Sequence, residues 1–136
     1  MMTIQTIYQG DLRTLAKHIH SNVEMITDAP LDNKGKGEAF SPTDLLAASL
    51  GSCMLTIMGI AARNHGFDID GTRIEIYKIM ASNPRRVAEV QLKFFMPEIK
   101  YSMQEKKILD LAARTCPVAL SLHPDLKQTI EFNYST

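Results

Sequence analysis

The chain has 136 residues, of which 45% are hydrophobic and 22% are charged, a composition typical of a globular protein. This length suffices for one domain with its own core and is too short for two, so we expect a single domain over residues 1–136. The 15 basic residues balance the 15 acidic residues and form no cluster, which disfavours nucleic-acid binding.

The first five residues, MMTIQ, contain neither a basic region nor an apolar run, so we expect no signal peptide. Two cysteines without such a signal indicate a reducing compartment, and we therefore expect a cytoplasmic protein. Taken singly, each cysteine is most simply interpreted as a small buried hydrophobic residue.

Strand signals dominate the first third of the chain. Residues 3–8 favour a strand, turn residues follow at 9–11, and two further strand-like runs lie between Leu12 and Thr27. The next segment, residues 28–37, is rich in Asp, Asn, Gly and Pro and is predicted to be a loop.

A long helix is predicted to begin at Ser41, which suits the N-cap, and Pro42 suits the first helical position. Asp44 adds a negative charge to the first turn, where the helix dipole favours it. Residues 45–62 carry no charge, and Arg63 to Gly66 provide the signals that end a helix. The length fits a membrane span, but the serines, threonine and glycines within the run dilute its apolarity, so we reject that interpretation.

A helix that is apolar on nearly all sides must be buried on nearly all sides. One short chain can cover one face of it with strands and has little left for the other. We therefore expect a second copy of the chain to cover the remaining face, as a homodimer.

The remaining elements can be predicted from periodicity and capping. Residues 73–80 and 89–94 alternate as two strands joined by a turn at residues 82–84, and Ser102 to Glu105 form a capping box that opens a second helix. Pro117 ends this helix or restarts a short helical turn, and residues 127–134 form a last strand. The order β-β-β-α-β-β-α-β predicts an α+β fold with mainly antiparallel pairing.

Cys53 lies in the middle of the uncharged helix, where a thiol is inert unless a positive charge stabilises its thiolate. We expect Arg13, on the N-terminal strands, to supply this charge. Arg63 is ten positions along the same helix, roughly 15 Å away, and Arg114 would point away from Cys116. Each arginine, taken singly, is more simply interpreted as a solvated surface charge.

Other chemical motifs are weak. The sequence has no CxxC pair, no zinc-finger spacing and no phosphate-binding glycine loop. Cys116, His123, His18 and His20 could gather round a metal, although nothing in their local spacing requires it.

Two segments resemble a known family. Residues 41–53, SPTDLLAASLGSC, resemble the first-cysteine helix of the OsmC and organic hydroperoxide resistance proteins, and residues 113–118, ARTCPV, resemble their second-cysteine motif. Asp68 to Gly71 also fits, and the resemblance extends from about Gln9 to Phe132.

The resemblance implies an OsmC-like α+β fold, in which antiparallel sheets wrap two central helices in an intertwined homodimer. It also implies that Cys53 is the peroxidatic cysteine and Cys116 the resolving one. An N-terminal arginine stabilises the thiolate in such proteins, and a glutamate near the start of the cysteine helix holds that arginine. Here Thr43 and Asp44 follow Pro42, so Asp44 is the candidate for the orienting acid and Arg13 for the arginine.

Three functions remain open. The first is a thiol-dependent peroxidase that reduces organic hydroperoxides through a Cys53 sulfenate and a Cys53–Cys116 disulfide, with an external dithiol as reductant and no metal, flavin or nicotinamide. The second is a hot-dog-type thioesterase, in which a carboxylate such as Asp44 would act. The third is a non-catalytic binding protein for an apolar ligand or a metal.

Overall fold

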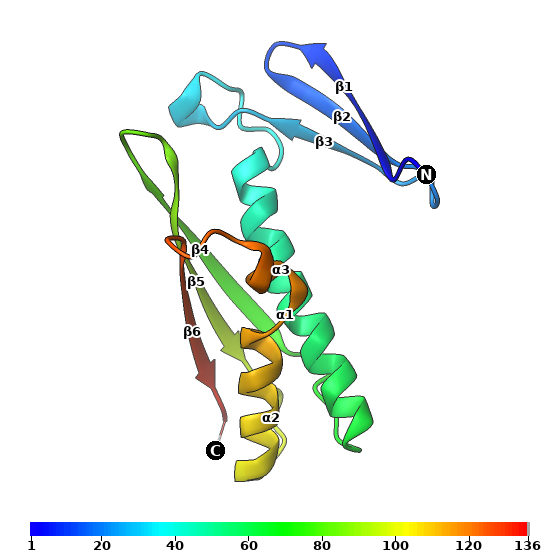
Figure 1. The fold of residues 1–136 in the computed structure, drawn as a ribbon, viewed down its shortest axis with the longest axis vertical. Coiled ribbons are helices and arrows are strands. Elements are labelled where there is room, and N and C mark those ends of the chain that lie inside the picture. The colour runs from blue at the N-terminus through cyan, green and yellow to red at the C-terminus, as the bar shows by residue number, and fades with distance from the viewer. Residues whose placement is uncertain (136) are drawn as a thin grey trace. The chain divides into compact units, whose positions relative to one another are not determined.

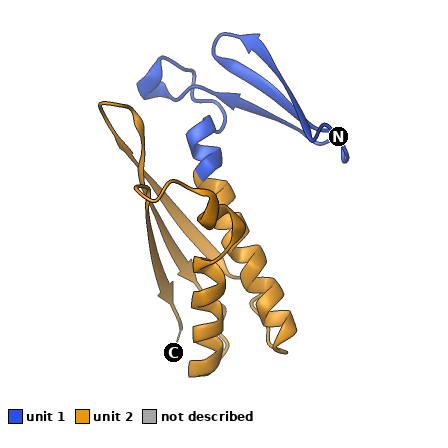
Figure 2. Ribbon diagram, in the orientation of Figure 1, with its two compact units in different colours: residues 1–46 blue, residues 47–136 orange. Residues whose placement is uncertain are grey.

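A computed structural model describes residues 1–135, which divide into two compact units, Met1–Leu46 and Ala47–Thr136 (Figure 2). In chain order the elements are β1 (Ile4–Gly10), β2 (Arg13–His18), β3 (Glu24–Asp28), the short 3-10 helix η1 (Leu31–Asn33), α1 (Pro42–Asn64), β4 (Arg73–Ala81), β5 (Arg86–Phe95), α2 (Met103–Arg114), α3 (Pro117–Ser121) and β6 (Lys127–Asn133) (Figure 1). The α+β class and the order of the long elements are confirmed.

The first unit contains an antiparallel sheet of order β1-β2-β3. The β1–β2 turn is tight because Gly10, Asp11 and Leu12 all have positive φ, which only glycine adopts at no cost. In the β2–β3 register, Arg13 lies opposite Asp28 at the end of the sheet that continues into the loop before α1.

The second unit contains a sheet of order β4-β5-β6. β4 and β5 form the predicted antiparallel hairpin, whereas β6 runs parallel to β5. Of the four strand pairs within residues 1–135, three are antiparallel, as expected for mainly antiparallel sheets, and the parallel β5–β6 pair is the exception. A parallel neighbour needs a crossover connection, and α2 and α3 provide it.

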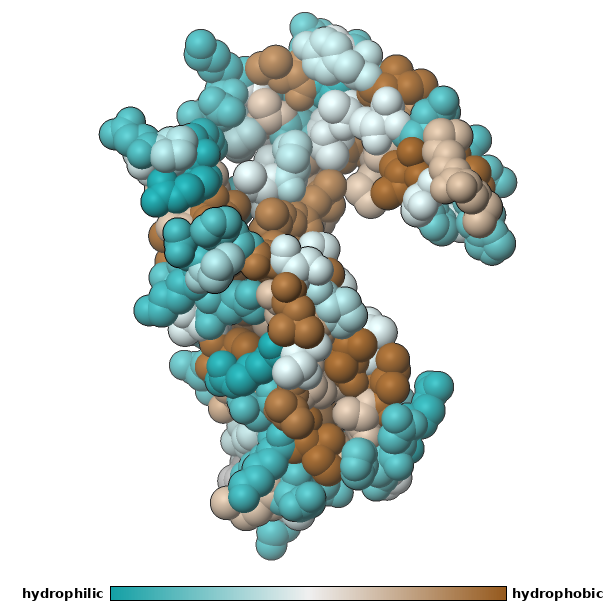
Figure 3. Space-filling model, in the orientation of Figure 1, coloured by the Kyte–Doolittle hydropathy of each residue, from teal (hydrophilic) through white to brown (hydrophobic). Residues whose placement is uncertain are grey.

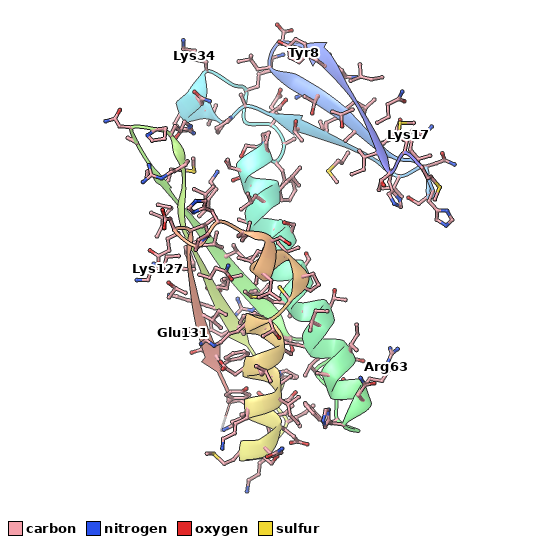
Figure 4. The ribbon with its side chains drawn as sticks, in the orientation of Figure 1. Tyr8, Lys17, Lys34, Arg63, Lys127 and Glu131 are labelled. Atoms are coloured by element: carbon pink, nitrogen blue, oxygen red, sulfur yellow. The ribbon has the colours of Figure 1, made fainter. Side chains whose placement is uncertain are left out.

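One face of this sheet carries the core. Alternate residues of β5 are fully buried, namely Val90, Leu92 and Phe94, and their neighbours on β4 and β6 pack on the same face. The buried face of α1 and the buried residues Leu109, Ala112 and Ala113 of α2 join the same cluster. The opposite face is polar, and Lys127 and Glu131 project outward from β6 (Figure 4).

The helix α1 is buried on one side only. The positions buried within the chain follow helical spacing: Ala47, Leu50, Gly51, Met54, Met58 and Ala62. Positions between them, including Ser52, Thr56 and Ile60, are exposed, and apolar side chains reach the surface in both units (Figure 3). Within residues 1–135, α1 also meets the length and composition of a membrane span, a test that the core helices of soluble proteins pass as well.

Candidate thiol site

The structure brings together two cysteines that lie 63 positions apart. Cys53 lies on α1, Cys116 lies between α2 and α3, both are free thiols, and both belong to the second unit. Cys53 packs against the core cluster that contains Cys116, and it is one of the groups that raise the pKa of the Cys116 thiol, so the two thiols are neighbours. Two neighbouring thiols are candidates for oxidation to a disulfide.

The sequence around Cys116 explains its position. A residue before proline is biased towards extended backbone, and Cys116 has φ −66° and ψ 150°. α2 therefore ends at Arg114, and Pro117 takes the first position of α3. Cys116 becomes the N-cap of α3, and its Sγ accepts a hydrogen bond from the Ala119 N–H at 3.4 Å.

The two thiols differ in exposure. Cys116 has no exposed surface, whereas Cys53 is half-buried. Burial raises the pKa of the Cys116 thiol, and its contact with Cys53 adds to this effect, while the N–H groups of Ala119 and Val118 oppose it. Cys116 is therefore the less reactive thiol of the pair at neutral pH.

α1 approaches the sheet closely beside Cys53. A Cβ atom added to Gly51 would lie 2.5 Å from Cδ1 of Ile76 on β4. Leu50 and Met54, the residues on either side of Gly51 and Cys53, have no exposed surface. The backbone that carries Cys53 is thus fixed by a well-packed face of α1.

Arg13 is held by two carboxylates that were not among the predicted site residues. Its Nε and Nη2 atoms donate to the two Asp28 oxygens at 2.7 and 2.8 Å, and Nη2 also donates to Glu38 at 3.2 Å. The hydrogen bonds from Arg13 lower the pKa of Asp28 and raise the pKa of Arg13. No local sequence pattern predicts that Asp28 binds Arg13, because this pairing depends on the β2–β3 register.

Asp28 and Glu38 hold Arg13 with different strength. The Asp28 side chain is 1% exposed and also accepts the backbone N–H of Glu38 at 3.1 Å, whereas the Glu38 side chain is 63% exposed. A buried bidentate pair has fixed geometry, but an exposed single contact is screened by solvent. Asp28 therefore sets the orientation of the guanidinium.

Asp44 takes part in the predicted start of α1. The Ser41 N–H donates to its carboxylate, and the Asp44 N–H donates to Ser41 Oγ, both at 3.0 Å. This reciprocal pair is a capping box, and Ser41 is almost fully buried. These contacts give Asp44 a role in beginning the helix.

The other candidate residues are placed as follows. Arg114 donates to both oxygens of Asp110 at 3.0 Å, one turn earlier on α2. Arg63 extends from the last turn of α1 (Figure 4). In the described part of the chain, no three Cys, His, Asp or Glu side chains form a group that could hold a metal ion.

The first unit also has an apolar hollow of about 650 Å³. It lies on one face of the β1-β2-β3 sheet and at the start of α1, and its lining is mainly aliphatic, including Ile4, Ala16, Val23, Met25 and Leu45. An apolar sheet face of this kind is normally covered by another element.

The family model for OsmC-like proteins matches residues 35–131, so this chain belongs to the OsmC-like protein family. The resemblance found in the two cysteine motifs is thereby confirmed. Among solved structures, an osmotic stress induced and detoxification response protein from Psychrobacter arcticus is 55% identical, with a TM-score of 0.93 over 98% of this chain and 96% of that chain.

More distant structures share the fold. An OsmC-like protein from Mycoplasma pneumoniae is 18% identical, with a TM-score of 0.81 over 98% of this chain and 96% of that one. An organic hydroperoxide resistance protein from Legionella pneumophila is 13% identical, with a TM-score of 0.76 over 98% of both chains. No curated protein matches the chain.

Proposed function

We propose that this protein is a thiol-dependent peroxidase that reduces organic hydroperoxides. The observation that carries the proposal is the proximity of Cys53 and Cys116, two free thiols that lie 63 positions apart in the sequence and pack in the same cluster. Membership of the OsmC-like family supports a role in handling peroxides, because the related fold from Legionella pneumophila is that of an organic hydroperoxide resistance protein.

The proposed reaction has two oxidative steps. The Cys53 thiolate attacks the terminal oxygen of the hydroperoxide, the O–O bond breaks, and the departing alkoxide takes a proton and leaves as an alcohol. The Cys116 sulfur then attacks the Cys53 sulfenic acid and displaces water, which forms the Cys53–Cys116 disulfide. An external dithiol returns both residues to thiols.

The difference in exposure supports this assignment of roles. The half-buried Cys53 can meet a substrate, whereas the fully buried Cys116 meets only Cys53 and the core. Leu55 and Ile57 on α1 are partly buried apolar residues near Cys53, and such surroundings favour an organic hydroperoxide over hydrogen peroxide.

We assign the activation of Cys53 to Arg13, through the family resemblance and the chemistry of its guanidinium. Asp28 and Glu38 engage Nε and Nη2, so the bonds found within residues 1–135 leave the Nη1 edge of the guanidinium for another acceptor. We therefore propose Asp28 as the acid that orients Arg13. The resemblance implies such an acid, and Asp44 was the expected candidate.

We further propose that the functional form is a homodimer. Two surfaces support this: the exposed side of α1, which carries no charged side chain from Leu45 to Ala62, and the aliphatic hollow on the first sheet. In a symmetric dimer, each copy would contribute the same two surfaces to the interface, so a second copy of the chain would cover both of them.

The test is the consumption of an organic hydroperoxide by the reduced full chain in the presence of excess dithiothreitol. We expect turnover by the wild type and its loss in Cys53→Ser. Cys116→Ser keeps the attacking thiol, so it should form the Cys53 sulfenic acid but no Cys53–Cys116 disulfide. A wild type that consumes no hydroperoxide contradicts the proposal. Hydrolysis of an acyl thioester that persists in Cys53→Ser would instead support the thioesterase.

A further inference from the structure

The two sulfurs of the thiol pair are not equally open to attack. Cys116 has no exposed surface and belongs to the core cluster with Leu109 and Ala113, whereas Cys53 is half-buried. Thiol–disulfide exchange needs a nucleophile to approach the attacked sulfur in line with the S–S bond, so access decides which sulfur reacts. In a Cys53–Cys116 disulfide, a thiolate that attacks Cys116 Sγ in line with the S–S bond would have to pass through the core.

We propose that the external dithiol attacks the disulfide at Cys53 alone and that Cys116 leaves as the thiolate. The inference rests on the proposed function, which supplies the disulfide. A reductant thiolate forms a bond to Cys53 Sγ, the S–S bond breaks, and its electron pair passes to Cys116 Sγ. The second thiol of the reductant then attacks the reductant's own sulfur, closes a disulfide within the reductant and releases Cys53 as the thiolate.

Hydrogen-bond donors for the leaving sulfur are already in place. The Ala119 N–H points at Cys116 Sγ at 3.4 Å, and the Val118 N–H also favours the thiolate. The first turn of α3 that carries these donors is fixed, because Gln128 on β6 donates to the Ala119 carbonyl at 3.0 Å. A thiolate that forms at Cys116 therefore gains hydrogen bonds without rearrangement of the backbone.

One effect opposes this direction. Burial raises the pKa of the Cys116 thiol, and a thiol of higher pKa leaves more slowly. Exchange rates depend only fractionally on thiol pKa, whereas attack on a sulfur without exposed surface requires α3 to open first. The difference in access to the two sulfurs is a larger effect than the difference in leaving-group pKa, so we expect attack at Cys53.

The experiment identifies the sulfur that receives a one-thiol reductant. The full chain is oxidised with diamide, treated briefly with glutathione, quenched with acid and N-ethylmaleimide, and mapped by peptide mass spectrometry. We expect glutathione on Cys53 in at least about tenfold excess over Cys116. The same treatment in concentrated urea should give similar amounts on both cysteines, because unfolding exposes both sulfurs.

Glutathione found on Cys116 in the folded protein, or in equal amounts on both cysteines, overturns the inference. So does a failure of diamide to link the pair. A second measurement uses 4,4′-dithiodipyridine on the reduced single-cysteine variants: folded Cys53→Ser should react at least about tenfold more slowly than folded Cys116→Ser, and equal rates overturn the inference. Diamide needs no peroxidase activity, so a protein that forms the link but consumes no hydroperoxide contradicts only the proposed function.

Discussion

Arg13 and Asp28 face each other across β2 and β3, and both oxygens of the Asp28 carboxylate accept hydrogen bonds from the Arg13 guanidinium. The Asp28 carboxylate is buried and the Arg13 guanidinium is partly exposed. Asp28 therefore holds the guanidinium in place while part of it remains accessible. The arginine can thus donate in one direction without losing its orientation.

Arg13→Ala should slow the alkylation of Cys53 by iodoacetamide at pH 7 by about tenfold, because a charge-assisted hydrogen bond to the thiolate is lost. The measurement is made in a Cys116→Ser background, so that one thiol reports. Lys17→Ala, on the same strand, is the matched control and should change the rate little. If both variants alkylate as fast as their parent, Arg13 does not activate Cys53.

Asp28 should make stability depend on pH in the acid range. Its pKa lies below the ordinary value of 3.8 in the folded protein, so its contribution is complete above that value and is lost as the pH falls through the folded pKa. Denaturant unfolding from pH 6 to pH 2 should show a steeper loss for the wild type than for Asp28→Asn. Parallel curves would show that the pair adds no pH-dependent stability.

Arg13→Ala should also destabilise the protein more than the double variant Arg13→Ala, Asp28→Asn does. The single change leaves a buried carboxylate without its partner, and the second change removes that charge. The midpoint of urea unfolding is the measurement. A double variant less stable than the single one would contradict this account.

Leu109→Ala should lower the free energy of unfolding by about 2–5 kcal/mol, because Leu109 is fully buried and its truncation leaves a cavity in the core. Leu111→Ala, on the exposed side of the same helix, should change it by about 0.5 kcal/mol or less. Urea unfolding of both variants decides the matter, and equal losses would contradict the described packing of α2.

Gly51→Ala and Gly59→Ala should act in opposite directions. Both glycines lie inside α1, where alanine improves helix propensity by about 1 kcal/mol. The new Cβ at Gly59 has no neighbour within 4 Å, but at Gly51 it meets Ile76 at 2.5 Å and costs about 1–3 kcal/mol. The midpoint temperature of thermal unfolding should therefore rise for Gly59→Ala and fall for Gly51→Ala. A destabilising Gly59→Ala would show that the proposed second copy packs on Gly59 itself, and a stabilising Gly51→Ala would contradict the described contact with Ile76.

Local signals were sufficient to predict most elements from the sequence. The capping box at Ser102, the start of α1 at Ser41 and the break of α2 before Pro117 each depend on residues within one turn. Cys53 and Cys116 could be paired only through their motifs, because nothing local joins positions 63 apart. These motifs occur in a family whose model covers residues 35–131.

Two features could not be predicted in this way. The parallel pairing of β6 with β5 depends on how the crossover returns to the sheet, and a period-two pattern is the same in both directions. The Arg13–Asp28 pair depends on the register between β2 and β3. The sequence of the loop that joins these strands does not fix that register. Asp44 was chosen because the resemblance implies an orienting acid near the start of the cysteine helix, whereas the acids on Arg13 come from β3 and the loop after it.

The crossover between β5 and β6 determines when the thiol pair can be completed as the chain is made. Cys53 is synthesised 63 residues before Cys116, and the first turn of α3 gains its anchor from Gln128 only when β6 has emerged. During translation, Cys53 is therefore present as a solitary thiol. An oxidant that reaches the nascent chain meets a sulfur without its resolving partner, so newly made molecules should be more prone to overoxidation than mature ones.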